Sequence, residues 1–454
     1  MRPIIKHKLQ HMGHHDGGES CGSGSCNRTV FHVPRVEGHG NIEVVISEGE
    51  IESLKWVIDE SPRFFEKMIQ GQSHEEVARI ISRICGICGV GHTMASLQAT
   101  ERAFGIEISE QTRKLRKICV NGATLQSNIL HVGVLVLPDL LGMDDMLELV
   151  KVRNEATMAA LELKKLGNDV CDLIGGRTTH PFKMVVGGVT SLPDPDKLED
   201  LLEELIFSRG KLAAVVEFMK PLLQGLPVFP REREFISLTH PDEYALYDGV
   251  ICTNDGTADP SEYLKYTNEY MSDQSSALFS KYKGEPYMVG ALARCHHNFD
   301  QLHPAAQAVA KDLGWSVPSY NPFDNNIAQL LECVHVVEDS IDIIEELLDH
   351  GFDQQELDFK VTPRAGIGVG AHEVPRGILY HSYEYDDSGH IVHANAVIPT
   401  NQNHAAIQQD FEWIVPQVMD RTEDEIVKTL IQTVHAYDPC ISCSVHQLVK
   451  VQFK

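Results

Sequence analysis

Two CxxC pairs near opposite ends of the 454-residue chain constrain its fold more than any other feature of the sequence. One pair is Cys85 and Cys88, and the other is Cys440 and Cys443. Two intervening residues let both sulfurs of a pair converge on one metal ion, often where a loop meets the start of a helix. Because two such pairs make a four-sulfur site, we expect a fold that brings the two ends of the chain together.

Four cysteines also occur in structural zinc sites, which are the alternative interpretation of these pairs. The pairs of a zinc site ordinarily lie some tens of residues apart in a small knuckle, whereas positions 88 and 440 are distant here. In a long intracellular chain, CxxC spacing indicates metal or redox chemistry more often than disulfides. Spacing alone leaves zinc open, so the surrounding residues must decide.

The residues around both pairs resemble the two signature motifs of the large subunit of nickel–iron hydrogenases. These motifs are Arg83-Ile84-Cys85-Gly86-Ile87-Cys88 with His92, and Asp438-Pro439-Cys440-x-x-Cys443 with His446. Shorter matches are Arg35-Val36-Glu37-Gly38-His39, Arg63-Phe64-Phe65-Glu66, Gly175-Gly176-Arg177-Thr178-Thr179-His180-Pro181, Glu373-Val374-Pro375-Arg376-Gly377 and Pro399-Thr400. The resemblance implies a catalytic subunit that cleaves H2 heterolytically into protons and electrons, or runs the reverse reaction.

The same resemblance implies a set of metal ligands. Cys85 and Cys440 would be terminal ligands of nickel, while Cys88 and Cys443 would bridge nickel to an iron that carries carbon monoxide and cyanide. Thiolates are soft ligands that suit this chemistry.

Residues around the centre follow by motif position. His92 would donate a hydrogen bond to a bridging sulfur, and Arg376, after Pro375, would lie over the open site near one cyanide. Thr400, after Pro399, would donate to the other cyanide. Without the resemblance these would be ordinary core or surface residues.

Two further roles concern protons and a second ion. Glu37 matches the carboxylate that takes a proton from a terminal cysteine, here Cys440. Glu66 and His446 match ligands of a magnesium or iron ion near the C-terminus, with a backbone carbonyl, taken here as that of His404, completing the protein ligands.

Helical periodicity dominates the chain, with β-hairpins at 40–58 and 377–397. We therefore expect an α-rich α+β fold, a central bundle of long helices with small peripheral hairpins or sheets, as in nickel–iron hydrogenase large subunits. The expected helices are 75–103, 109–137, 143–174, 196–222, 261–282, 302–313, 325–351 and 404–434.

The expected organisation is a single catalytic body over residues 29–446 between two short terminal segments. Residues 1–28 indicate a flexible tail, in which Cys21 and Cys26 are read as tail residues with metal binding as the alternative. Residues 447–454 form an extension after the second motif, either a precursor segment or a retained tail.

Composition excludes several classes of protein. A formal charge of −26 argues against nucleic acid as a partner, because its phosphates are bound mostly by cations. We find no run of about 18 uninterrupted apolar residues and expect no transmembrane segment. Residues 1–27 carry His and Gly where a secretory signal has an apolar core, so we expect no export signal.

Partners and location are inferred from subgroup features. Ser127 stands where membrane-linked members usually have Asp, and residues 290–294 and 399–406 look more like soluble, cytoplasmic members. Those members couple to nicotinamide/flavin, deazaflavin or heterodisulfide-reductase subunits. The chain has no further clustered cysteines for an electron relay, so an iron–sulfur small subunit is required.

Two other functions remain as alternatives. A quinone-binding scaffold like that of respiratory complex I resembles the same fold but lacks the four cysteines. A zinc-stapled interaction protein would need no Glu37, Arg376 or Thr400 in motif positions.

Overall fold

The computed structural model describes residues 26–47, 50–143, 148–149 and 155–446. Most of the expected tail, including Cys21, and the extension 447–454 lie outside the described residues. Strand β1 begins at Cys26, so residues 26–28, which were expected in the tail, belong to a strand.

A three-stranded antiparallel sheet opens the chain. It contains β1 (Cys26–His32), β2 (Gly40–Ser47) and β3 (Glu50–Ile58), in that order. The expected hairpin at 40–58 is confirmed, and β1 extends it. Trp56 is fully buried, and its backbone amide donates to Gln408 of α13 (Pro399–Val418) at 2.8 Å, so the sheet is fixed to that helix.

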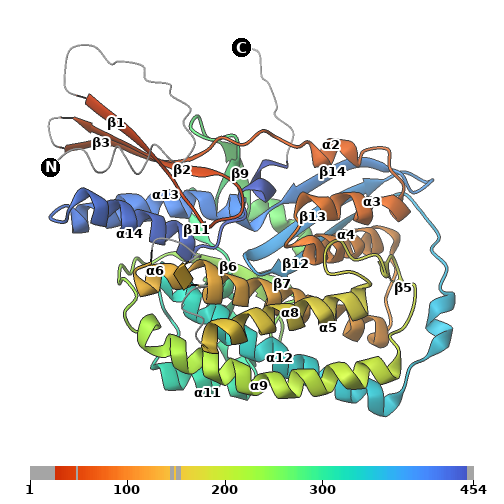
Figure 1. Ribbon diagram of the computed structural model, residues 1–454. Helices are drawn as coiled ribbons and strands as arrows, with labels where there is room; N and C mark the ends of the chain where they lie inside the picture. The colour runs from red at the N-terminus through yellow and green to blue at the C-terminus, as the bar shows by residue number, and fades with distance from the viewer. Residues whose placement is uncertain (1–25, 48–49, 144–147, 150–154, 447–454) are drawn as a thin grey trace.

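Long helices form the lower layer of the molecule in Figure 1. They are α5 (Glu110–Leu130), α8 (Glu155–Gly175), α9 (Pro195–Leu223), α11 (Pro304–Leu313) and α12 (Asn325–His350). Their positions agree with the expected helices. After α5 the chain passes through a π-helical stretch, η2 (His131–Leu135), into α6 (Leu137–Leu141).

A second antiparallel sheet packs against α4 (Gly89–Phe104). Its strands are β12 (Gly366–Val374), β13 (Gly377–Tyr385) and β14 (Ile391–Val397), so the hairpin at 377–397 is confirmed. An ideal Cβ on Gly368 would lie 2.0 Å from the carbonyl oxygen of Ala99, and one on Gly370 would lie 1.9 Å from that of Ala95. Helix and strand therefore meet through their backbones.

The remaining elements complete the body. A four-stranded sheet has the order β11-β6-β7-β8. The shorter helices and strands are α2 (Phe65–Met68), α10 (Ala291–Asn298), η7 (Ser442–Val445), β4 (Met184–Val185), β5 (Gly188–Val189), β6 (Glu234–Thr239), β7 (Val250–Thr253), β8 (Gly256–Ala258) and β11 (Tyr287–Met288).

The expected helix at 261–282 is wrong. Only a 3-10 turn, η3 (Pro260–Lys265), lies there, followed by the antiparallel strands β9 (Asn268–Met271) and β10 (Leu278–Lys281). The segment contains four tyrosines, which favour strands, and the helical spacing of its apolar residues was coincidental.

Two other expected helices are each divided. The range 75–103 contains α3 (His74–Ile81) and α4, separated by the first cysteine motif. The range 404–434 contains α13 and α14 (Glu423–Ala436). The side chain of Thr422 accepts from the amide of Glu425 and that of Glu425 accepts from the amide of Thr422, a capping box that starts α14 as a new helix.

Among the described residues, one helical segment, Glu110–Leu141, is long and apolar enough to cross a membrane by length and composition alone. The segment contains no uninterrupted apolar run of about 18 residues, because Asn and Gln residues occur within it. In the structure 72% of its most apolar window is buried inside the protein, and the core helix of a folded domain passes the same test.

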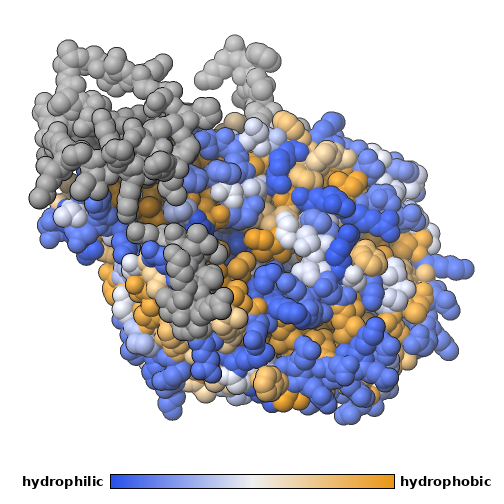
Figure 2. Space-filling view, in the orientation of Figure 1, coloured by the Kyte–Doolittle hydropathy of each residue, from blue (hydrophilic) through white to orange (hydrophobic). Residues whose placement is uncertain are grey.

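The surface is mixed. On the face shown in Figure 2, hydrophobic residues occur in small groups among hydrophilic ones. This agrees with the strongly acidic composition of the chain.

Candidate metal centre

The first cysteine pair lies in the turn that precedes α4. Cys88 is the N-cap residue of this helix. The backbone amides of Ile87 and Cys88 point at the sulfur of Cys85, at 3.3 and 3.1 Å. These two amides fix the position of the Cys85 sulfur at the start of the helix.

The second pair follows α14 and is tied to the N-terminal part of the chain. Glu37 and Cys440 form a parallel β-bridge, in which the amide of Ile441 donates to the carbonyl of Glu37 at 2.8 Å. The amide of Cys440 donates to the hydroxyl of Thr400, in the first turn of α13 after Pro399, at 3.0 Å. Three distant segments thus fix the position of Cys440.

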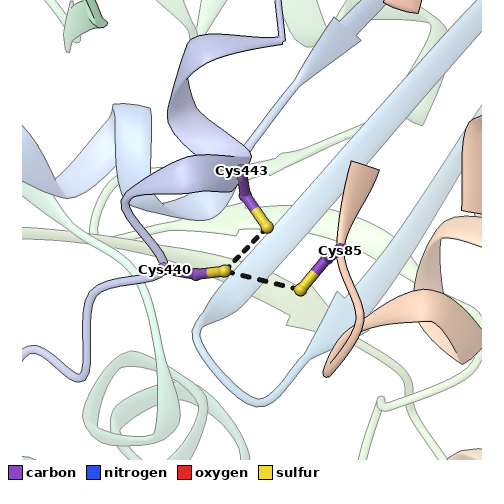
Figure 3. Close-up of side chains that lie close together, drawn as sticks. All are labelled: Cys85, Cys440 and Cys443. Carbon is purple, nitrogen blue, oxygen red and sulfur yellow. Dashed lines mark hydrogen bonds between the residues drawn. The ribbon is translucent and has the colours of Figure 1, made fainter. Parts of the chain in front are cut away.

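The fold brings the four cysteines together. The sulfur of Cys440 lies 3.4 Å from that of Cys85 and 2.7 Å from that of Cys443, and Figure 3 shows it pointing between them. These three sulfurs lie within 4.8 Å of one another. Cys88 is not one of these three: its sulfur lies beside them, 3.4 Å from Arg376 Nη1, and hydrogen bonds from the thiols of Cys440, Cys443 and Cys85 hold its pKa well below the ordinary value.

The donor set suits a soft metal centre. All four cysteines are buried free thiols, and thiolates are the ligands that nickel, iron and zinc take in such sites. Their chemistry therefore fits a nickel–iron centre, and the surrounding residues must distinguish it from zinc.

Arg376 lies beside the thiols as a buried cation. Its Nη1 donates to the sulfur of Cys88 and to the hydroxyl of Ser127, each at 3.4 Å, and its Nη2 donates to Asp438 Oδ1 at 2.8 Å. Its Nε is buried without a hydrogen-bond partner among the described residues. Sequence reasoning did not assign Asp438 a role, although its place immediately before Pro439-Cys440 was a usable signal.

A buried chain of side chains continues behind Asp438. Gln329 Nε2 donates to Asp438 Oδ2 at 3.1 Å, while Gln329 Oε1 lies 2.5 Å from His131 Nδ1. The other ring nitrogen of His131 lies 2.9 Å from the carbonyl oxygen of His435. His131 begins the π-helical stretch η2, and such stretches occur frequently at functional sites. The sequence motifs assigned no role to Gln329 or His131.

A second buried cation, Arg294, holds the turn that presents Arg376. It donates to the carbonyl oxygens of Val374 and Pro375 at 2.8 and 3.0 Å. Its remaining donors bind the carboxylates of Glu332 and Glu373, and all three charged side chains are fully buried. The backbone before Arg376 is therefore fixed by an ion cluster.

We expect Arg294→Met to lower the free energy of unfolding by about 3–5 kcal/mol, because it leaves two buried carboxylates without their cation. Arg209→Met is the matched control: Arg209 pairs with Glu338 but its side chain is 47% exposed, so we expect a loss of about 0–1 kcal/mol. Urea denaturation of both variants measures the difference. Equal losses would contradict the role given to the cluster.

His92 lies in α4, one turn after Cys88. Its ring Nδ1 lies 3.1 Å from His381 Nε2, and burial lowers its pKa to about 3, so the ring is neutral at physiological pH. The expected hydrogen bond from His92 to a bridging sulfur stays a prediction.

Glu37 lies next to Cys440, the cysteine from which the resemblance implies that it takes a proton. Its Oε2 is 3.2 Å from the sulfur of Cys440 and accepts from the amide of Ser442 at 3.0 Å. A carboxylate in direct contact with the thiol is the geometry that proton transfer requires.

The residues expected at a second ion are only partly brought together. His446 Nε2 lies 3.8 Å from Glu66 Oε1 and 2.8 Å from the carbonyl oxygen of Ala396. Glu66 Oε1 also accepts from the amide of Ala396 at 2.9 Å. The carbonyl at this position therefore belongs to Ala396.

The structure places His404 elsewhere. Its Nδ1 accepts from the indole of Trp56 at 2.9 Å, and burial lowers its pKa to about 3. Its own carbonyl lies inside α13, where helix carbonyls are used by the amide four residues later. The contact with His446 favours Ala396 over His404 as the carbonyl donor, and the identity of this donor stays a prediction.

Comparisons with known proteins agree with this geometry. The family model described as nickel-dependent hydrogenase matches residues 63–152 and 243–446, ranges that contain both cysteine pairs. Sulfhydrogenase 1 subunit alpha of Pyrococcus furiosus is 33% identical over 425 residues, covering 92% of this chain and 97% of the relative. Sulfhydrogenase 2 subunit alpha of that organism is 30% identical over 419 residues, covering 91% and 97%.

A solved structure of an NAD+-reducing NiFe hydrogenase in the H2-reduced state has a similar fold. It gives a TM-score of 0.83 at 25% identity and covers 92% of this chain and 99% of the solved chain. The match extends over almost the whole body described above.

Proposed function

The chain belongs to the nickel-dependent hydrogenase family as a large, catalytic subunit, and on this basis we propose how its residues share the reaction. Cys85, Cys88, Cys440 and Cys443 would hold a nickel–iron centre, with Cys85 and Cys440 as ligands of nickel alone and Cys88 and Cys443 as ligands shared with an iron that would carry carbon monoxide and cyanide. The observation that carries this proposal is the convergence of four buried cysteines from both ends of the chain beside Arg376 and Glu37.

When bound, the nickel–iron centre supplies the reversible heterolytic cleavage of H2. Arg376 provides a fixed positive charge next to the thiolates, oriented by Asp438. The hydroxyl of Thr400 accepts from the amide of Cys440, and its own proton is available to one cyanide. His92, which is neutral, donates to a bridging sulfur.

Proton transfer is assigned to Glu37. The carboxylate contacts the sulfur of Cys440 directly and is held by the amide of Ser442. A proton on this sulfur can therefore pass to Glu37 without rearrangement of the backbone.

A second ion, magnesium or iron, is proposed between Glu66, His446 and the carbonyl of Ala396. Carboxylate and carbonyl oxygens suit a hard cation. Glu269 lies near this site: burial, with a smaller contribution from Glu66, raises its pKa to about 8, and its Oε1 is buried without a hydrogen-bond partner among the described residues.

Electrons require a partner subunit. Within the described part of the chain, the site cysteines form the only group of three or more Cys, His, Asp or Glu side chains whose ligand atoms converge, so no second cysteine cluster is available there to carry electrons away. We propose an iron–sulfur small subunit and further electron-transfer subunits of nicotinamide/flavin, deazaflavin or heterodisulfide-reductase type, in a cytoplasmic complex. The NAD+-reducing neighbour supports the first type.

We expect this chain to co-purify with an iron–sulfur subunit when its native operon is expressed with an affinity tag on it. The buried centre cannot exchange electrons with a soluble carrier unless clusters connect them. Mass spectrometry and iron content of the purified complex check this. An isolated chain that is fully active with a natural acceptor would contradict it.

Metal analysis combined with infrared spectroscopy tests the function itself. Nickel and iron together with bands of carbon monoxide and cyanide are expected in the purified complex, along with H2-dependent dye reduction. Zinc alone, without these bands, would indicate a structural site instead.

A further inference from the structure

We propose that residues 1–12 bind back onto the body of their own chain as an amphipathic helix, in an apolar groove between the N-terminal sheet and α14. These residues are called the N-terminal segment below, and residues 13–25, which join them to β1, are called the linker. The inference goes beyond the proposed function and does not depend on a metal.

The groove lies between the sheet β1–β3 and α14, which Figure 1 shows beneath that sheet. Its volume is about 180 Å³. Val44 of β2 and Leu430 of α14 are its buried lining residues. The other lining residues are half-buried or exposed, so the groove is open from outside, and they are Thr29, Phe31, Ile51, Leu54, Met419, Glu423, Ile426 and Val427.

Both walls of the groove are built from regular structure. Thr29, Val44 and Leu54 stand opposite one another in the register of the three strands, so they share one face of the sheet. Ile426 and Leu430 lie one helical turn apart on α14. An apolar groove of this kind is a surface on which the apolar side of a helix can bind.

The sequence of the N-terminal segment has the matching pattern. Met1, Ile5, Leu9 and Met12 are separated by four, four and three residues, the spacing of one face of a helix, and Ile4 widens that face. The single proline of the segment lies in the first turn, where a helix tolerates it. The segment can therefore present a continuous apolar stripe to the groove.

The linker is long enough for the N-terminal segment to reach the groove. Eight of its 13 residues are Gly or Ser, and a coil of this composition and length has an end-to-end distance of about 20 Å. It joins the body at Cys26, the first residue of β1, and Phe31 of the groove lies about 17 Å further along that strand. Tethering over such a distance gives an effective concentration of about 1 mM, so even a weak contact is occupied.

Charge favours this occupant over a second copy of the chain. The N-terminal segment has three basic residues and no acidic one, whereas the chain as a whole carries a formal charge of −26. Glu423 lines the groove, and Asp420 and Asp424 are exposed beside it, opposed by the single cation of Arg421. A basic segment is attracted to this surface, and the acidic body of another copy is repelled.

Binding in the groove would link the two elements that bring Glu37 to Cys440. Glu37 lies in the connection between β1 and β2, and α14 ends at Ala436, shortly before Cys440. Glu37 and Cys440 pair directly in a β-bridge. A helix bound across the groove therefore holds the sheet and α14 together on the outer side of this contact.

The first test uses the full chain and measures access of trypsin to the N-terminal segment. Met419→Lys places a cation in the groove and should speed cleavage after Lys6 and Lys8 about tenfold, the factor expected when one apolar side chain is lost from a contact. Met271→Lys is the matched control, because Met271 is exposed on β9 outside the groove, 57% against 45% for Met419. It should be cleaved at the rate of the wild type, as measured by mass spectrometry of the released N-terminal peptides.

A second test changes the segment and leaves the groove intact. Ile5→Asp/Leu9→Asp disrupts the apolar stripe, whereas His7→Asp/Gln10→Asp adds the same two charges on the opposite side of the helix. Deuterium exchange of the backbone amides of α14 should be faster in the first double variant than in the second. Since the added charge is equal, the difference reports the apolar contact.

A third test identifies the occupant of the groove. Zero-length cross-linking of an equal mixture of unlabelled and ¹⁵N-labelled chains should join Lys6 or Lys8 to Glu423 or Asp424 within one chain only. Cross-links between differently labelled chains would show that a second copy occupies the groove and would overturn the proposal. Protection of α14 that requires the iron–sulfur subunit rather than residues 1–12, or equal trypsin cleavage of the wild type and Met419→Lys, would overturn it as well.

Discussion

Cys443→Ser is expected to yield a protein with little nickel and with H2-dependent dye reduction lowered by more than about 100-fold. Replacement of residues that only orient a metal's ligands costs about 10–100-fold, and loss of a ligand should exceed this. An alcohol is a far poorer bridge between soft metal ions than a thiolate. The same result is expected for Cys88→Ser.

Nickel content and dye reduction of the purified variants check this prediction. Cys252→Ser is the matched control, since Cys252 is a partly buried thiol in β7 away from the cluster. It should retain nickel and activity. Full activity in Cys443→Ser or Cys88→Ser would remove that residue from the ligand set.

Glu37→Gln is expected to leave nickel, iron and the diatomic ligands in place while lowering H2/D2O exchange by about 10²–10⁴-fold. Glutamine keeps the size of the side chain and an oxygen that can accept from Ser442, but it carries no titratable proton. The carboxylate that contacts the sulfur of Cys440 at 3.2 Å is then lost as a proton acceptor.

The rate of H2/D2O exchange per nickel distinguishes a role of Glu37 in proton transfer from a purely structural role. A structural carboxylate would give reduced stability or assembly, with an unchanged rate per assembled site. Glu52→Gln, at an exposed position of β3, controls for loss of a negative charge in the same region. A normal rate in Glu37→Gln would exclude this residue from the proton path.

The sequence predicted the long helices and the two hairpins because their apolar residues recur with the period of the element. Prediction from the sequence failed where the local composition favours one element and contacts with distant parts of the chain stabilise another. Strand β12 was not predicted, because glycine is uncommon in strands and this strand contains Gly366, Gly368 and Gly370. These glycines are required here because the strand backbone lies against α4. At 261–282, apolar spacing suggested a helix where strands β9 and β10 form.

Side-chain motifs located the cysteines, Glu37, Arg376 and Glu66, and the structure shows which groups accompany them. Asp438 was recoverable from its neighbours in the second motif. Gln329 and His131 were not, because they reach Arg376 only through Asp438 and come from two different helical segments. A backbone carbonyl such as that of Ala396 carries no side-chain signal, so a sequence motif cannot point to it.

The contact between α4 and β12 has a consequence for the geometry of the metal centre. Helix α4 begins after Cys88, and β12 ends just before Pro375 and Arg376, so both partners of the sulfur–guanidinium contact are carried by these two elements. Main-chain atoms meet directly at Gly368 and Gly370, so even alanine would push the elements apart. The close backbone contact thereby sets the distance between the guanidinium of Arg376 and the sulfur of Cys88.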